Sequence, residues 1–168
     1  MKYEILKDEF IELDGRKLYQ IKALKDFRDV KEGEFGGYIE SERNLSHEGD
    51  AWVSGDARVC GNARVSGSAR VSGSAWVYGN ARVSGSARVL SRHSVVWFSN
   101  VGTENGTLTV YCGKNGLIAT RGCFTGSVEE FLAKSAKVHD EKNKREYELL
   151  IEVARSRLGE AQGNIEDE

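Results

Sequence analysis

Arginine recurs at the outward positions of a repeated six-residue motif, and Arg64 and Arg82 are eighteen residues apart. If three copies of the motif form one turn of a solenoid, these two side chains lie one above the other. Adjacent guanidinium groups repel each other unless a phosphate or carboxylate lies between them, and arginine binds such anions in a bidentate manner. The pair, flanked by Asn62 and Asn80, is therefore a candidate anion-binding site; the alternative is that both arginines only solubilise a strand exterior.

A second group with binding chemistry follows the repeat and comprises Arg121, Cys123, His139, Arg145 and Tyr147. It combines cations, a histidine that changes charge near neutral pH and an aromatic ring, which together can hold a nucleotide by charge and stacking. The structural alternative is that Cys123, Phe124 and Tyr147 pack the hairpin on the helices while Arg145 pairs with a nearby glutamate. A weaker alternative is that Cys123 acts as a nucleophile with His139 as its base.

Enzyme signatures are weak in this sequence. The histidines are His47, His93 and His139, and the cysteines are Cys60, Cys112 and Cys123. Neither set has the spacing of a zinc site or a disulfide framework, and His47 and His93 fall in the Val and Ala columns of the repeat. The sequence has no P-loop, dinucleotide fingerprint or nucleophile elbow. We expect no catalytic residues, metal or cofactor, with a hexapeptide-type acyltransferase as the enzymatic alternative.

The element that must position the arginine pair is the repeat from Gly49 to Leu90, which reads GDAWVS, GDARVC, GNARVS, GSARVS, GSAWVY, GNARVS, GSARVL. Residues two apart share one side of a strand but not one face of a helix, so Ala and Val of each copy point inward. Arg or Trp points outward, and Gly forms a tight corner. A six-residue period is typical of a parallel β-helix, here with a little over two turns.

The solenoid is predicted over residues 37–101, because Ile39 and Leu45 fall in phase with the Ala column and Val95 and Val101 with the Val column. Residues 1–36 predict a β-meander with an Asp14-Gly15 turn, which caps one end, followed by a linker. Residues 102–158 predict a hairpin of TLTVYC and LIATRGCF, and then two helices. The first helix begins at Val128 after a Ser127–Glu130 capping box, and the second spans about 144–158. Residues 159–168 predict a flexible acidic tail.

The outward positions define three faces. The first stacks Trp52, Arg70 and Arg88, the third contains the Arg64–Arg82 pair, and the second carries Arg58, Cys60, Trp76 and Tyr78, with Val96. Exposed aromatic clusters usually mark contacts, so the second face is a candidate homo-oligomer interface or the seat of the C-terminal module. The alternative is that these aromatic side chains only cover a small core.

Composition bounds the class of protein. The chain has 168 residues, 39% hydrophobic and 30% charged, with a formal net charge of −2. This near balance argues against general nucleic-acid binding. No apolar run reaches membrane-spanning length, and the N-terminus is too charged for a signal peptide, so we expect a cytoplasmic protein without membrane contact.

Three stretches carry a family resemblance: GGYIESERNLSHEG, the repeats, and RGCFTGSVEEF with His139 and Arg145-Glu146-Tyr147. They resemble small phage and prophage proteins built on GDARV or GNARV hexapeptides. The resemblance covers most of residues 33–150 and implies a left-handed parallel β-helix, but no established activity.

The functional hypothesis is a non-enzymatic, phage-type counter-defence protein acting in the host cytoplasm. It would sequester an anionic nucleotide signal at the subunit interfaces of a dimer or trimer, or block a host defence protein directly. The alternatives are an acyltransferase and a structural, polymer-forming protein.

Overall fold

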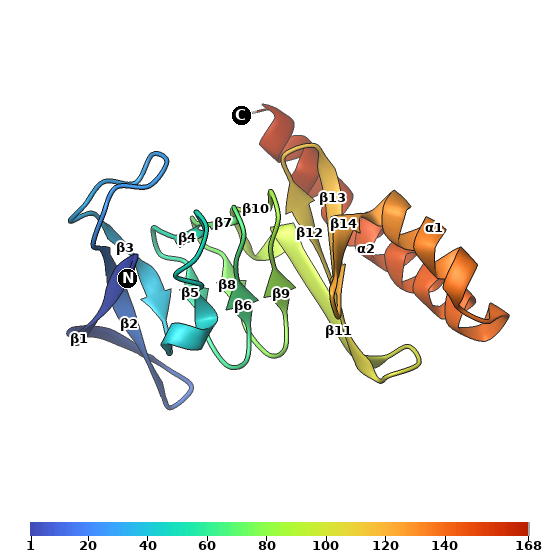
Figure 1. Ribbon diagram of the computed structural model, residues 1–168, viewed down its shortest axis with the longest axis horizontal. Coiled ribbons are helices and arrows are strands. Elements are labelled where there is room, and N and C mark those ends of the chain that lie inside the picture. The colour runs from blue at the N-terminus through green and yellow to red at the C-terminus, as the bar shows by residue number, and fades with distance from the viewer. Residues whose placement is uncertain (168) are drawn as a thin grey trace.

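A computed structural model describes the backbone of residues 1–167 and the side chains of residues 1–159. The chain is elongated, with a β-meander at one end, a β-solenoid in the middle, and a sheet covered by two helices at the other end (Figure 1). The prediction of a mainly β protein with a repeat solenoid and two C-terminal helices is confirmed.

Seven two-residue strands form the solenoid, one for each copy of the repeat: β4 (Trp52–Val53), β5 (Arg58–Val59), β6 (Arg64–Val65), β7 (Arg70–Val71), β8 (Trp76–Val77), β9 (Arg82–Val83) and β10 (Arg88–Val89). Strands eighteen residues apart pair in parallel, in the orders β4-β7-β10, β5-β8 and β6-β9. Three copies of the motif therefore make one turn, and the three expected faces exist.

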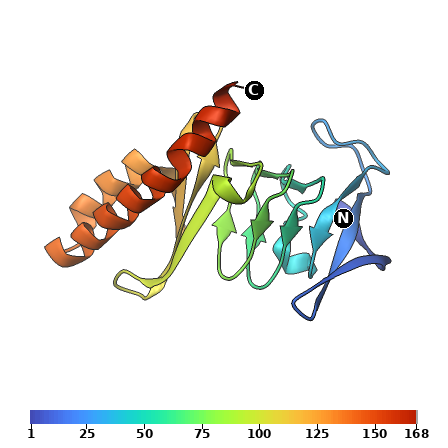
Figure 2. The ribbon, with the colours of Figure 1, turned by 180° about the vertical axis from the view of Figure 1, so that it is seen from behind.

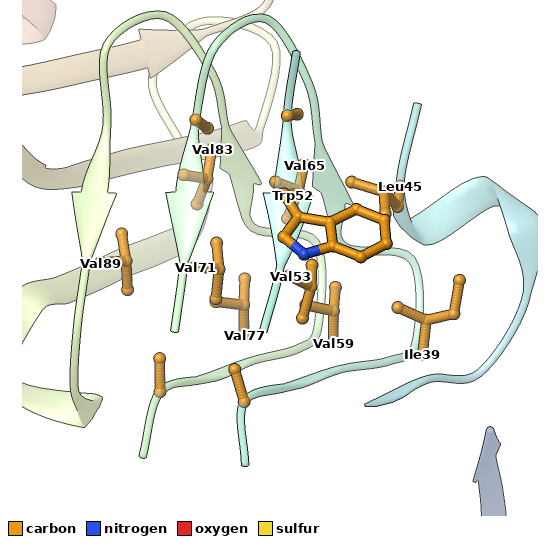
Figure 3. Packing of buried hydrophobic residues seen from close by; sticks show 14 of the residues in the cluster. Ile39, Leu45, Trp52, Val53, Val59, Val65, Val71, Val77, Val83 and Val89 are labelled. Carbon is orange, nitrogen blue, oxygen red and sulfur yellow. The ribbon is translucent and has the colours of Figure 1, made fainter. Parts of the chain in front are cut away.

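The solenoid core consists of the Ala and Val columns. All seven alanines and seven valines of the repeat are at most 1% exposed, and Figure 3 shows valines of successive rungs one beside the next. The tightest corner leaves no room for a side chain: a Cβ on Gly73, at φ 61°, would lie 2.3 Å from the carbonyl oxygen of Leu90. Each core valine contributes about 1.5–3 kcal/mol of burial, so the two columns dominate the stability of this region.

The N-terminal meander consists of β1 (Tyr3–Leu13), β2 (Arg16–Ala23) and β3 (Phe35–Ile39). The two expected strands before the turn are one strand with a bulge between Ile5 and Phe10. The Asp14-Gly15 turn forms as predicted, with both residues at positive φ. Strand β3 pairs antiparallel with β2 and parallel with β5, so the meander continues the solenoid sheet and covers its first edge.

The phase of the repeat changes before Gly49. Ile39 pairs with Val59 and Leu45 with Val65, a spacing of twenty residues, so both belong to the Val column and not to the Ala column as predicted. The spacing returns to eighteen at Trp52, so the two extra residues lie in the corner between these points. His47 lies in this wider corner after helix η1 (Glu42–Asn44), and its ring stacks on Tyr3 at 4.0 Å. Its predicted place in the Val column is therefore wrong.

Most of the first face is covered. Trp52 stands in register with Arg70, but it is only 2% exposed, because the β2–β3 loop folds over it and the Phe27 ring meets its indole edge-on at 5.3 Å. The same loop supplies Asp29, which lies 2.7 Å from the Arg70 guanidinium. Arg88 remains exposed on this face.

The C-terminal module begins earlier than predicted. Its antiparallel sheet contains β11 (Val95–Val101), β12 (Gly106–Gly113), β13 (Gly116–Arg121) and β14 (Phe124–Ser127), and the predicted hairpin is its centre. Val95 joins the solenoid core, but Val101 packs against the other core cluster, so the Val column does not reach residue 101. His93 lies exposed in helix η2 (Arg92–Ser94), where Ser94 is the buried residue, and not in the Ala column.

Helix α1 (Val128–Val138) begins at the predicted residue, and Ser127 and Glu130 form the predicted capping box. Helix α2 (Glu141–Asp167) is longer than expected and includes residues 159–167, which were predicted to form a flexible tail. Glu168 of that predicted tail lies outside the described residues. No described helix is both long enough and apolar enough to cross a membrane.

The C-terminal sheet lies between the solenoid and the two helices (Figures 1 and 2). Side chains alternate along β12, so Leu108, Val110 and Cys112 join the helix-side core while Tyr111 joins the solenoid core. Side-chain hydroxyls of β12 accept hydrogen bonds from backbone amides at the C-terminal end of the solenoid. The Arg82 amide donates to Thr109 Oγ1 and the Ser84 amide donates to Tyr111 Oη, both at 3.0 Å. This arrangement gives the sheet two faces with different surroundings.

Candidate functional site

Two hollows lie on either side of the β13–β14 hairpin and contain most of the binding residues expected from the sequence. The solenoid groove is lined by residues that include Arg43, Arg64, Ser66, Arg82, Ser84 and Thr125. The helix pocket is lined by residues that include Arg121, Cys123, Phe124, Lys134, His139 and Tyr147. Gly122 lines both hollows.

The predicted arginine pair forms the floor of the solenoid groove. Arg64 on β6 and Arg82 on β9 are directly in register, and both side chains are exposed. Within residues 1–159 neither has a carboxylate partner, whereas Arg70 on the first face is paired with Asp29. The pair therefore presents two adjacent positive charges to solvent.

The walls of the groove come from helix η1 and from the β13–β14 hairpin. Arg43 Nη1 donates to Asn62 Oδ1 at 3.0 Å, and Asn62 in turn donates to Asn80 Oδ1 at 3.3 Å. On the opposite wall, Ser84 Oγ and Thr125 Oγ1 lie 3.1 Å apart. The groove has a volume of about 390 Å³, and its charged lining consists of three arginines, His47 and Glu42. Its surroundings favour anions.

A hydrogen bond between the Arg121 and Tyr147 side chains lies at the centre of the helix pocket. Arg121 Nε donates to Tyr147 Oη at 3.1 Å, which orients the guanidinium group. Two glycines make room for this pair, namely Gly102 in the β11–β12 connection and Gly106 at the start of β12. A Cβ on Gly102 would lie 2.0 Å from Tyr147 Oη, and one on Gly106 would lie 2.8 Å from Arg121 Cζ. Both glycines were missed from the sequence, where only the Gly-Thr-Glu-Asn-Gly turn pattern could have indicated them.

His139 is the C-cap residue of α1. Its Nδ1 lies 2.9 Å from the hydroxyl of buried Ser135, and its ring centroid lies 5.2 Å from that of Tyr147. Because Ser135 occupies Nδ1 in either tautomer, Nε2 is the nitrogen available to a ligand. Tyr147 is itself only 1% exposed and packs edge-on against Phe131 at 5.0 Å. Tyr147 therefore positions Arg121 and His139 and offers no ring face to a ligand.

The remaining lining of the helix pocket supplies a second cation, a half-buried aromatic ring and one carboxylate, that of Glu104. Lys134 Nζ lies 5.3 Å from the ring centroid of half-buried Phe124. Sequence reasoning missed both residues as site residues. Cys123 is exposed and lines the same pocket as His139, which has a volume of about 340 Å³. Arg145, by contrast, is exposed on α2 and is not among the residues that line this pocket.

The second face carries an aromatic cluster at its C-terminal end. Trp76 packs on Tyr78 at 4.8 Å, Tyr78 meets Trp97 of β11 edge-on at 4.7 Å, and Arg92 lies over Trp76 at 4.8 Å. The C-terminal module seats on the end of the solenoid and reaches this face through Trp97, a residue that sequence reasoning missed. Arg58 is half-buried on the same face, and the use of this face as an oligomer interface stays a prediction.

The buried thiols have no reactive character. Burial raises the pKa of the Cys60 thiol, and raises that of Cys112 to about 11, so both are protonated at neutral pH. Among the described residues no three His, Cys, Asp or Glu side chains are grouped as a metal site requires.

Comparison with protein families gives matches within the repeat. A family model described as the YdcK β-solenoid repeat matches residues 51–67, 57–73, 63–78 and 75–91. These matches support a repeat β-solenoid protein and do not extend into the meander or the C-terminal module. No curated protein matches the chain.

Proposed function

We propose that this chain is a non-enzymatic binding protein that sequesters an anionic nucleotide in the helix pocket. The observation that supports the proposal is the meeting of Arg121, Lys134 and His139 with an accessible aromatic ring in one hollow. Cations and a ring face together match the phosphate and the base of a nucleotide, as charge and stacking do in proteins that bind single-stranded nucleic acids.

Each group has a distinct role in this proposal. Arg121 is held through Nε, so its two terminal nitrogens can bind phosphoryl oxygens in a bidentate manner. Lys134 adds a second positive charge and lies over the ring of half-buried Phe124. In this proposal its ammonium moves from the ring to the phosphate when a base stacks on Phe124. His139 Nε2 donates or accepts a further hydrogen bond according to its protonation state. No bond is broken in this scheme, so the activity is binding alone.

The proposal extends to the finer fold and setting implied by the phage-type resemblance. We propose a left-handed parallel β-helix that forms a dimer or trimer through the second face, in the cytoplasm of a phage-infected host. Tyr78 is 39% exposed within an aromatic cluster, a feature typical of protein contacts. Sequestering a nucleotide signal would make the protein a counter-defence factor, and direct blocking of a host defence protein is the other form of this role.

The test combines recovery of a natural ligand with titration. Mass spectrometry of material released by heating the purified protein identifies a bound nucleotide, and calorimetry with ribonucleoside 5′-monophosphates measures affinity. We expect Arg121→Ala to weaken binding roughly tenfold or more, because a hydrogen-bonded charge pair is lost. The matched control is Arg145→Ala, which removes an exposed arginine outside the pocket and leaves affinity unchanged.

Clear outcomes contradict the proposal. A wild-type protein that releases no nucleotide and binds none of the monophosphates rules out sequestration in this pocket. Turnover of acetyl-CoA would favour the acyltransferase alternative, and filaments detected by light scattering would favour the polymer-forming one.

A further inference from the structure

The solenoid groove and the helix pocket are separated by the tip of one hairpin. Strand β13 ends at Arg121 and β14 begins at Phe124, and Gly122 between them lines both hollows. A Cβ added to Gly122 would have no atom within 4 Å, so the tip is open. A ligand bound in one hollow can therefore extend over this tip into the other hollow.

The hairpin presents different chemistry to its two sides. Thr120 and Thr125 are paired across the strands, and Thr125 contacts Ser84 on the solenoid side. The next pair, Arg121 and Phe124, lines the helix pocket on the other side. Side chains of neighbouring residues in a strand point to opposite faces, so hydroxyls line one hollow and a cation with an aromatic ring lines the other.

The groove has the chemistry of a phosphoryl site and not of a base site. Its lining includes two in-register arginines without carboxylate partners within residues 1–159, together with Arg43 and the hydroxyls of serines and threonines. It contains no Phe, Tyr or Trp, and the ring of His47 is already stacked on Tyr3. Guanidinium and hydroxyl donors match phosphoryl oxygens, which only accept hydrogen bonds.

We infer that the ligand carries two separated phosphoryl groups, one bound by Arg121 in the helix pocket and the other between Arg64 and Arg82 in the solenoid groove. The ligand class is a linear 5′-phosphorylated dinucleotide, whose backbone crosses the hairpin tip at Gly122. Its first base stacks in the helix pocket, and its second base stays in solvent. This inference rests on the proposed function of the helix pocket and specifies the class of ligand that the pocket binds.

The experiment compares each ribonucleoside 5′-monophosphate with the matching 5′-phosphorylated dinucleotide by calorimetry on the full chain. We expect the dinucleotide to bind roughly tenfold or more tightly than the monophosphate, because the second phosphoryl group gains charge-assisted hydrogen bonds. In the double variant Arg64→Ala/Arg82→Ala, the dinucleotide should bind no more tightly than the monophosphate, and the affinity for the monophosphate should be unchanged. The matched control is Arg88→Ala, which removes an exposed arginine from the equivalent repeat position on another face.

A second variant tests the geometry of the arginine pair. The double variant Arg64→Lys/Arg82→Lys keeps both charges but loses bidentate contact with a phosphoryl group. It should therefore retain only part of the additional affinity for the dinucleotide over the monophosphate. Circular dichroism and thermal unfolding check that each variant is folded.

The outcomes separate this inference from the proposal on which it rests. Equal affinities for the two ligands, or a gain that persists in Arg64→Ala/Arg82→Ala, overturn the inference and leave nucleotide binding in the helix pocket intact. Failure of the wild-type protein to bind either ligand overturns both.

Discussion

The solenoid groove and the helix pocket are built in different ways, although only a hairpin tip separates them. The arginines of the groove stand on adjacent rungs whose register follows from a repeat of eighteen residues. The pocket instead gathers side chains from β13, α1 and α2, and its central bond joins residues 26 positions apart. The groove is a surface feature of a regular scaffold, whereas the pocket depends on how several elements pack. Substitutions should therefore affect the two hollows through different routes.

The largest effect is expected in the scaffold itself. Val71→Asp places a carboxylate in the fully buried Val column of the central strand of the first face. An uncompensated buried charge costs about 4 kcal/mol or more, so the solenoid should unfold or lose most of its stability. Urea unfolding followed by circular dichroism measures the change. The control Val153→Asp, on the exposed side of α2, should change stability little, and a similar loss in both variants would contradict a stability concentrated in the solenoid columns.

In the helix pocket, Gly102→Ala should reduce stability and nucleotide binding. The new Cβ would overlap Tyr147 Oη, which displaces the ring that positions Arg121. Positive φ alone costs about 1–2 kcal/mol for a residue with a side chain. Gly15→Ala is the matched control, because it has a similar φ of 78° and open space around it. We expect Gly102→Ala to lower the free energy of unfolding, measured by urea titration, by at least about 1 kcal/mol more than Gly15→Ala does, and to weaken nucleotide binding. Equal losses of stability would show that the Tyr147 side chain moves aside without cost.

The pH dependence of stability probes the N-terminal end of the solenoid. Lys2 is 1% exposed and donates to the Ala51 carbonyl at 2.6 Å, and burial lowers its pKa to about 8 from an unfolded value of 10.5. Below pH 8 both states are protonated, and above it the unfolded state binds more protons, so stability rises with pH until the unfolded pKa is reached.

Comparison with Lys2→Met isolates this contribution from other groups that titrate at alkaline pH. The unfolding free energy of wild type minus that of the variant should rise by about 2 kcal/mol between roughly pH 7.5 and pH 9.5. Urea titrations at the two pH values measure it. A constant difference would mean that the Lys2 ammonium is not destabilised by its burial.

The smallest effect is expected for the arginine pair of the groove. Arg64→Ala and Arg82→Ala, singly or together, should change stability by less than about 0.5 kcal/mol, since both side chains are exposed and unpaired within residues 1–159. Thermal unfolding measures this difference. A loss above about 1 kcal/mol would assign the pair a structural role and would weaken its interpretation as a binding site.

The errors in the predicted columns occur at the two ends of the repeat, where the regular eighteen-residue turns stop. Ile39 and Leu45 match the Ala column by counting in sixes, but two additional residues in the corner after Leu45 move them to the Val column. Val101 matches the Val column in the same way, yet β11 pairs with β12 and leaves the solenoid at Val95. Trp52 holds its predicted register, and a loop distant in sequence buries it. Periodicity therefore predicts register only while consecutive turns have equal length.

The sequence by itself determined the solenoid, its three faces and the register of Arg64 with Arg82, because each rung interacts with the next at a constant spacing along the chain. It also determined the start of α1, since a capping box is a local interaction. Only the tertiary structure decided that Arg121, Lys134 and His139 share a pocket, that Arg145 is outside it and that Tyr147 is buried. Those placements depend on the packing of α1 and α2 on the sheet, and contacts between distant segments have no period that a single sequence displays.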